Sequence, residues 1–258
     1  TEIFLHALTN VGNARMRIGE PGGQDDLERA LAMARAADLE EHVARALDNL
    51  GCNALHARDL PRATAWFTDG ITYTTDHDLD SWRFNLLAWR GYLRVVTGEW
   101  DLAEADAAAV LASQNPPPVS LIPALTARGL VRARRGDADA ALALDQALAR
   151  AERTGEIQRL RPVRVARAEA AWLSGDPARA AAELRAVREM TLERGSVWEI
   201  GEVYAWLARL GENELVETLP DRDLLPAPHR FALAGDWVAA AAAWDALGCH
   251  YDAALALL

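Results

Sequence analysis

The sequence predicts an all-α protein in which antiparallel helix hairpins stack into a right-handed superhelix. Composition and two repeated patterns lead to this prediction. Hydrophobic residues make up 51% of the chain and aromatic residues only 7%, with alanine prominent, which favours closely packed helices. A turn that begins with Gly and continues with an acidic residue recurs between apolar segments, at Gly98, Gly136, Gly175 and Gly235. A small residue recurs at intervals of 39, 40 and 38 positions, at Gly12, Gly51, Gly91 and Gly129.

The recurring turns predict where each hairpin bends. A glycine can end one helix in the left-handed conformation, and the acidic residue after it can cap the next helix. The small residue seven positions earlier, as Gly91 stands before Gly98, lets the two helices of a hairpin touch. Hairpin turns are therefore expected at six places, near Gly19, Arg58, Gly98, Gly136, Gly175 and Gly235.

The periodic segments divide residues 1–258 into a single helical-repeat domain of about six to seven hairpins. Pro123 and Pro162 are both expected in the first turn of a helix, where the missing N–H costs nothing. After residue 195 the pattern weakens, and the last unit begins near Pro226. In chain order, the expected hairpins span residues 1–38, 40–79, 82–115, 120–154, 160–195, 197–219 and 226–258.

The second hairpin carries the most specific spacing. Large apolar, Leu-Gly, small and aromatic positions follow one another at Leu47, Leu50, Gly51, Ala63 and Phe67. This pattern resembles the tetratricopeptide repeat, a helix-turn-helix unit that cannot bury its apolar face alone. Stacked units of this kind form a superhelix with a concave inner surface, which is the usual recognition site. The alternative interpretation is an alanine-rich helical bundle whose regular spacing is accidental.

The closing stretch carries a second resemblance. Three segments, Phe231 to Trp237, Ala239 to Trp244 and Leu247 to Leu257, resemble the end of the tetratricopeptide region in large ATP-binding transcriptional regulators of the LuxR type. His250 departs from that pattern, which often has Pro. The resemblance implies the sensor or interaction arm of a bacterial regulator, with a signal-transduction ATPase and a DNA-binding domain elsewhere in a longer chain. The alternative is a free-standing adaptor for protein–protein assembly.

Composition and charge exclude several functions. All 27 basic residues are Arg, so a phosphate-binding loop or Schiff-base chemistry would lack its lysine. The net charge of -11 opposes direct binding of nucleic acid. Without a secretory segment or a long apolar run, we expect a cytoplasmic chain with no membrane partner and with Cys52 and Cys249 reduced. No catalytic set, cofactor or metal site is predicted, and the expected role is recognition rather than catalysis.

Three arginines precede the small residue of successive first helices, where the repeat usually has Leu. Buried charges are tolerated only when they are paired. The expected partners are acidic residues of the second helices, such as Asp106, Asp145 and Glu183, with anion binding as the alternative. The three arginines are Arg90, Arg128 and Arg167.

The first helix of each hairpin is expected to line the concave groove, where a small-molecule effector or a protein segment would bind. Amide and charged groups there can fix the orientation of a ligand, and aromatic planes can cover its apolar or sugar-like faces. The alternative is that these side chains only solvate the inner face. The candidate binding residues are Asn13, Arg17, Arg45, Asp48, His56, Asn85, Tyr92, Arg134, Glu169, Trp172 and Trp198.

Overall fold

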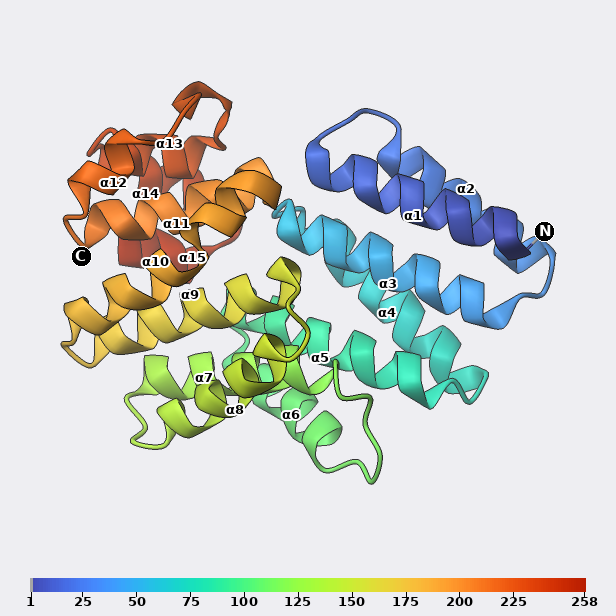
Figure 1. Ribbon diagram of the computed structural model, residues 1–258. Coiled ribbons are helices and arrows are strands. Elements are labelled where there is room, and N and C mark those ends of the chain that lie inside the picture. The colour runs from blue at the N-terminus through green and yellow to red at the C-terminus, as the bar shows by residue number, and fades with distance from the viewer. Residues whose placement is uncertain (1) are drawn as a thin grey trace.

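The computed structural model describes residues 2–258, and over that range it contains α-helices, one short 3-10 helix and no strand (Figure 1). The all-α prediction is therefore confirmed. No helix within the described range is both long and apolar enough to cross a membrane. The helices are α1 (Glu2–Ile18), α2 (Gly23–Ala36), α3 (Glu40–His56), α4 (Leu60–Asp76), α5 (Asp80–Thr97), α6 (Trp100–Leu111), α7 (Leu121–Arg135), α8 (Ala140–Glu152), α9 (Ile157–Leu173), α10 (Pro177–Arg194), α11 (Val197–Arg209), α12 (Asn213–Glu217), α13 (Ala227–Leu233), α14 (Trp237–Ala246) and α15 (His250–Ala256), with the 3-10 helix η1 at Arg222–Leu224.

Consecutive helices pack as antiparallel pairs, from α1 with α2 to α9 with α10. Each odd-numbered helix of the first four pairs also contacts the next odd-numbered helix, so α1, α3, α5, α7 and α9 form one layer. The buried side chains fall into several clusters, each shared mainly by neighbouring pairs. A core divided in this way is typical of repeat proteins, in which each unit buries its apolar face against its neighbours.

All six predicted hairpin turns contain a residue in the left-handed region. The backbone angle φ is +73° at Gly19, +84° at Gly98 and +75° at Gly235. Arg58 adopts φ of +60° where the other turns have glycine, although a left-handed conformation costs a non-glycine residue free energy. The turn predictions are confirmed, and Arg58 is the one non-glycine residue at the left-handed position of these six turns.

The small residues of the first helices allow close contact within a hairpin, as predicted. A Cβ atom added to Gly51 would lie 2.6 Å from the ring of Phe67, and one added to Gly129 would lie 2.5 Å from Leu144. Carbon atoms in ordinary contact are about 3.5–4.0 Å apart. An alanine at either position would therefore force the Phe67 ring or the Leu144 side chain to shift.

Two local predictions differ from the structure. Helix α9 begins at Ile157 rather than near residue 160, so Pro162 lies inside the helix instead of in its first turn. Ile157 is buried in the same cluster as Val163, and this burial extends the helix by one turn before the proline. The last unit is also not a single hairpin, because residues 226–258 form the three short helices α13, α14 and α15.

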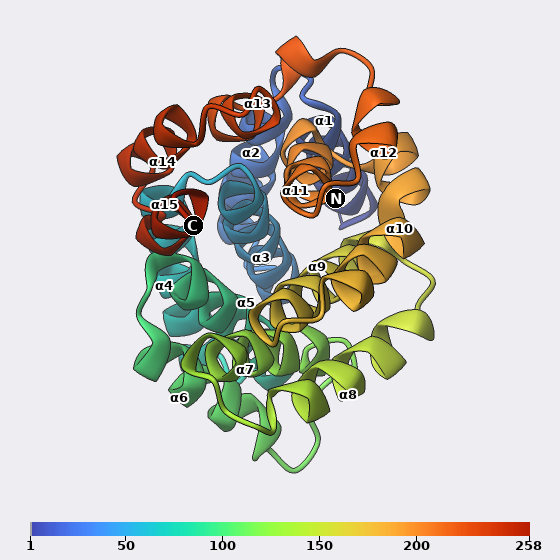
Figure 2. The same cartoon turned by 90° about the vertical axis from the view of Figure 1, so that its left-hand side faces the viewer.

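The C-terminal helices return to the first half of the chain. Helix α15 packs on α5, and Figure 2 shows α15 beside α4 and α5. One apolar cluster contains Phe67 and Leu86 together with Trp244 and Cys249. The stack of hairpins is therefore closed by its own C-terminal end, and its inner layer faces other parts of the same chain.

Candidate functional site

The predicted groove residues mostly contact other helices of the inner layer. Asn53 donates to Asn13 across α1 and α3 at 2.7 Å, and Asn85 donates to Asp48 across α3 and α5 at 2.8 Å. Arg134 of α7 holds Glu169 of α9 through two bonds of 2.7 and 3.1 Å. These polar pairs fix neighbouring hairpins relative to one another, and their groups are already partly satisfied.

The remaining candidates make similar contacts. Arg45 lies 3.0 Å from His6 of α1. The ring of Trp89 packs against both His56 and Tyr92, with centroids 5.6 and 5.9 Å apart. Trp172 packs edge-on against Trp206 at 5.9 Å. The structure thus distributes these residues along the inner layer, and it brings only some of them to one cavity.

Three of the candidates, Arg17, His56 and Trp198, do meet at one cavity. It has a volume of about 430 Å³ and lies where the ends of α1 and α3 face the start of α11. We call it the seam pocket, because its walls join the first two hairpins to the start of α11, which lies far from them in the sequence. Its lining residues are Met16, Arg17, Ile18, Gly19, Asn53, His56, Ala57, Gly195, Ser196, Val197, Trp198 and Glu199.

The α11 side of the seam pocket is held rigidly by a capping box. The Ser196 side chain accepts from the backbone N–H of Glu199, and the Glu199 carboxylate accepts from the backbone N–H of Ser196 at 2.8 Å. This reciprocal pair satisfies two N–H groups at the helix start. Trp198, between these two residues, packs against His229 and Trp244 of the C-terminal helices. The indole therefore forms a fixed wall.

A chain of ion pairs runs from the seam pocket into the interior. Arg17 lies 3.2 Å from Glu199, which also lies 3.2 Å from Arg161 of α9. Arg161 also binds Glu202, which lies 3.4 Å from Arg58. Arg161 and Glu199 are each only 4% exposed. These contacts join the first, second, fifth and sixth hairpins, so they hold the seam closed.

Burial and neighbouring charge set the ionisation of the pocket. Burial alone would raise the pKa of Glu199, but the guanidinium groups of Arg161 and Arg17 lower it to about 2. Burial, supported by nearby guanidinium groups, lowers the pKa of His56 to about 3. At neutral pH the pocket therefore presents a neutral imidazole beside an ionised carboxylate that already has cationic partners. The polar side chains that a ligand would meet are those of Arg17, Asn53, His56, Ser196 and Glu199.

A second, smaller cavity of about 60 Å³ lies among α11 and the C-terminal helices. Arg209 lies over the rings of Trp172, Trp206 and Trp237, at 5.4, 5.8 and 5.3 Å from their centroids. Within the described residues its only hydrogen bond goes to the Leu255 carbonyl, at 2.8 Å. This cavity has room for water molecules rather than for a larger ligand.

The three predicted arginine pairs are internal ion pairs. Arg90 donates to Asp106 at 2.7 and 2.9 Å, and Arg167 donates to Glu183 at 2.7 Å. Arg128 instead lies 2.8 Å from Glu104 of α6, two residues before Asp106. The prediction of internal pairing is confirmed, with a different carboxylate for Arg128.

Sequence reasoning missed the network residues Arg161, Glu199 and Glu202. No local pattern marks them, because their contacts depend on how far the stack of hairpins curves. One signal was available at Arg58, which replaces glycine at a left-handed position. Its guanidinium reaches Glu202, 144 residues further along the chain.

In a comparison with known proteins, no family model and no curated protein matches this chain.

Proposed function

We propose that this chain is a non-catalytic binding module of the tetratricopeptide type, whose hairpins form a right-handed superhelix. The repeated left-handed turns, the helix pairs and the close contacts at Gly51 and Gly129 support this proposal. The module binds a small effector or a short protein segment at its inner face. The seam pocket is the binding site.

The observation that carries the proposal is the size and position of the seam pocket. Its volume of about 430 Å³ lies within the range of about 300–1,000 Å³ that is usual for ligand sites. Apolar side chains and a few polar groups line it together, and Ile18 and Val197 at its edge are 70% and 42% exposed. A ligand there would touch α1, α3 and α11 at once, so binding would stabilise the closed arrangement of the hairpins.

The role of the module follows from the resemblance at the end of the chain. We propose that it is the sensor arm of a bacterial transcriptional regulator, whose ATPase and DNA-binding domains would respond to the state of the seam. The alternative is a free-standing adaptor that assembles proteins. A reading frame with a phosphate-binding loop upstream or a helix-turn-helix downstream would support the regulator.

Ligand binding at the seam pocket can be tested without knowing the natural ligand. We expect fragments from a library of small neutral and anionic compounds to shift the ¹⁹F resonance of Trp198 in protein labelled with 5-fluorotryptophan. Trp198→Phe assigns the resonance. Ala57→Leu adds a branched side chain to an exposed position in the pocket wall. It should lower the affinity of these fragments by about tenfold, or about 1.4 kcal/mol.

Ala112→Leu is the matched control. Ala112 is also an exposed alanine just after a helix, at the end of α6 and outside the pocket, so fragment affinity should not change. The proposal is wrong if no fragment moves the Trp198 resonance, or if the fragments that do so bind Ala57→Leu as well as wild type.

A further inference from the structure

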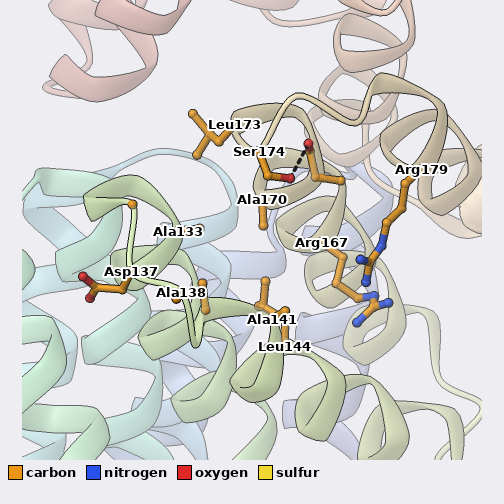
Figure 3. A pocket seen from close by; sticks show the side chains of 13 residues that line it. Ala133, Asp137, Ala138, Ala141, Leu144, Arg167, Ala170, Leu173, Ser174 and Arg179 are labelled. Atoms are coloured by element: carbon orange, nitrogen blue, oxygen red, sulfur yellow. Dashed lines mark hydrogen bonds between the residues drawn. The ribbon is translucent and has the colours of Figure 1, made fainter.

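A third cavity lies between the α7–α8 turn and the α9–α10 turn and shares no residue with the seam pocket. Its volume is about 370 Å³. Small side chains form most of its surface, among them Ala133, Ala138, Ala141 and Ala170 (Figure 3). We call this cavity the turn slot.

Comparison with the preceding repeat explains why there is a cavity at this place. Ala138 stands two residues after Gly136, and the residue at that place in the α5–α6 turn, 38 positions earlier, is Trp100. Trp100 packs against a cluster that contains Val95, Ala103 and Val131. One repeat later these positions are Ala133, Ala141 and Ala170, which line the turn slot.

The turn slot is therefore the place that the preceding repeat fills with its own indole. Between the two repeats, one Trp and two Val become Ala, which removes much of the apolar volume. Packed helices close only part of the space left by lost side chains. Trp100 is the first residue of α6, whereas Ala138 lies in the turn before α8 begins at Ala140. The cavity of about 370 Å³ that Ala138 lines has room for a tryptophan side chain from outside.

Charge next to the turn slot favours an acidic neighbour of that tryptophan. Arg179 is 49% exposed, and its closest carboxylate, Asp145, lies at 4.0 Å. Arg167 lies beside it, and both guanidinium groups lie across the cavity from Asp137 in Figure 3. In the preceding repeat, Asp101 follows Trp100, and its carboxylate lies 2.6 Å from the guanidinium of Arg135 in the next helix pair.

We propose that the turn slot binds a tryptophan side chain of a partner protein, with an acidic residue beside that tryptophan pairing with Arg179. This is a protein-docking site on the turns of the hairpins, and it is additional to effector binding at the seam pocket. Only the partner's indole takes the place of the Trp100 side chain, because the backbone at that place is the chain's own Asp137, Ala138 and Asp139.

The test uses a fluorescein-labelled peptide with the sequence acetyl-Gly-Glu-Trp-Asp-Leu-amide, which copies residues 98–102. Fluorescence anisotropy should show binding to wild type, and a peptide with Ala in place of Trp should not bind. Ala138→Trp, which fills the slot from within, should weaken binding by at least about tenfold and raise the melting temperature. Ala186→Trp is the control, at an exposed position of α10 outside the cavity.

Arg179→Glu tests the charge separately, because Arg179 is half exposed and the slot stays open in this variant. We expect this substitution to lower the affinity for the acidic peptide by about fivefold at low salt, and by less at high salt. Equal affinity for wild type and Ala138→Trp would overturn the proposal, as would no binding to wild type. Binding of N-acetyltryptophan but not of the peptide would overturn the assignment to a protein partner. None of these measurements involves the seam pocket.

Discussion

Replacing Arg161 with methionine is expected to destabilise the protein by about 3–5 kcal/mol at pH 7. Arg161 is 4% exposed and is the shared partner of Glu199 and Glu202. Its removal leaves buried carboxylates without their main cation, and breaking a buried ion pair from one side costs about this much. The free energy of unfolding from urea titration measures the change.

Arg185→Met provides the comparison for Arg161. Arg185 is 52% exposed and pairs with Glu212, and an exposed pair contributes only about 0–1 kcal/mol. Adding Glu202→Gln to Arg161→Met should restore part of the loss, since it removes one uncompensated charge. A loss for Arg161→Met no larger than for Arg185→Met would contradict a structural role for the network.

The effect of Arg161→Met should also depend on pH. In the wild type the lowered pKa of Glu199, about 2 against an ordinary 4.5, stabilises the fold above pH 4.5. This stabilisation is lost as the pH falls towards 2. The variant lacks most of it at neutral pH, so the difference between wild type and variant should shrink below pH 4.5.

The second large effect is expected for Asp252→Asn, which should stabilise the protein by on the order of 2 kcal/mol at pH 8. Asp252 is half-buried, and within the described residues neighbouring groups act on its carboxylate by charge, without a hydrogen bond. Burial raises its pKa to about 6, although Arg134 and Arg58 lower it in part. Asparagine has nearly the same shape but carries no charge to be desolvated. Two pKa units correspond to roughly 2–3 kcal/mol.

The sign of this effect can be checked by its pH dependence. The raised pKa of Asp252 means that the native state binds a proton more tightly than the unfolded chain. The advantage of the protonated form is complete below pH 4 and is lost as the pH rises through 6. The variant should therefore exceed wild type in stability at pH 8 and match it near pH 4. The quantity to compare is the difference in unfolding free energy between variant and wild type. The lowered pKa values of His56 and His229 destabilise both proteins in acid, so they cancel in this difference. Equal stabilities at pH 8 would contradict the desolvation of the half-buried Asp252 carboxylate.

The sequence predicted those features that depend on short stretches of chain. A left-handed turn needs only its own residues, so Gly98 and Gly136 identified their hairpins. The interval of 38 to 40 residues led to the candidate list, of which Arg17, His56 and Trp198 line the seam pocket. Pro162 was misplaced because prolines are commonest at helix starts, whereas burial of Ile157 extends α9 by an additional turn.

The closure of the chain could not be predicted in the same way. Arg17 and Glu199 are 182 residues apart, and their contact depends on small rotations accumulated over successive hairpins. The sequence pattern does not determine the rotation between two neighbouring hairpins closely enough for the curvature of the whole stack to be predicted. For the same reason the seam pocket, which exists only because the stack closes, could not be foreseen from its lining residues. The turn slot depends on neighbouring repeats alone, and the change from Trp100 to Ala138 is visible in the sequence.

The most direct test of the account is the distance across the seam. Ile18→Cys and Val197→Cys place nitroxide labels on the two exposed edges of the seam pocket, while burial raises the pKa values of the Cys52 and Cys249 thiols and disfavours their labelling. Double electron–electron resonance should give one narrow, short distance, which broadens when Arg161→Met is added. A broad distribution of long distances in the otherwise unmodified chain would show that the hairpins do not close, and would contradict a binding site at the seam.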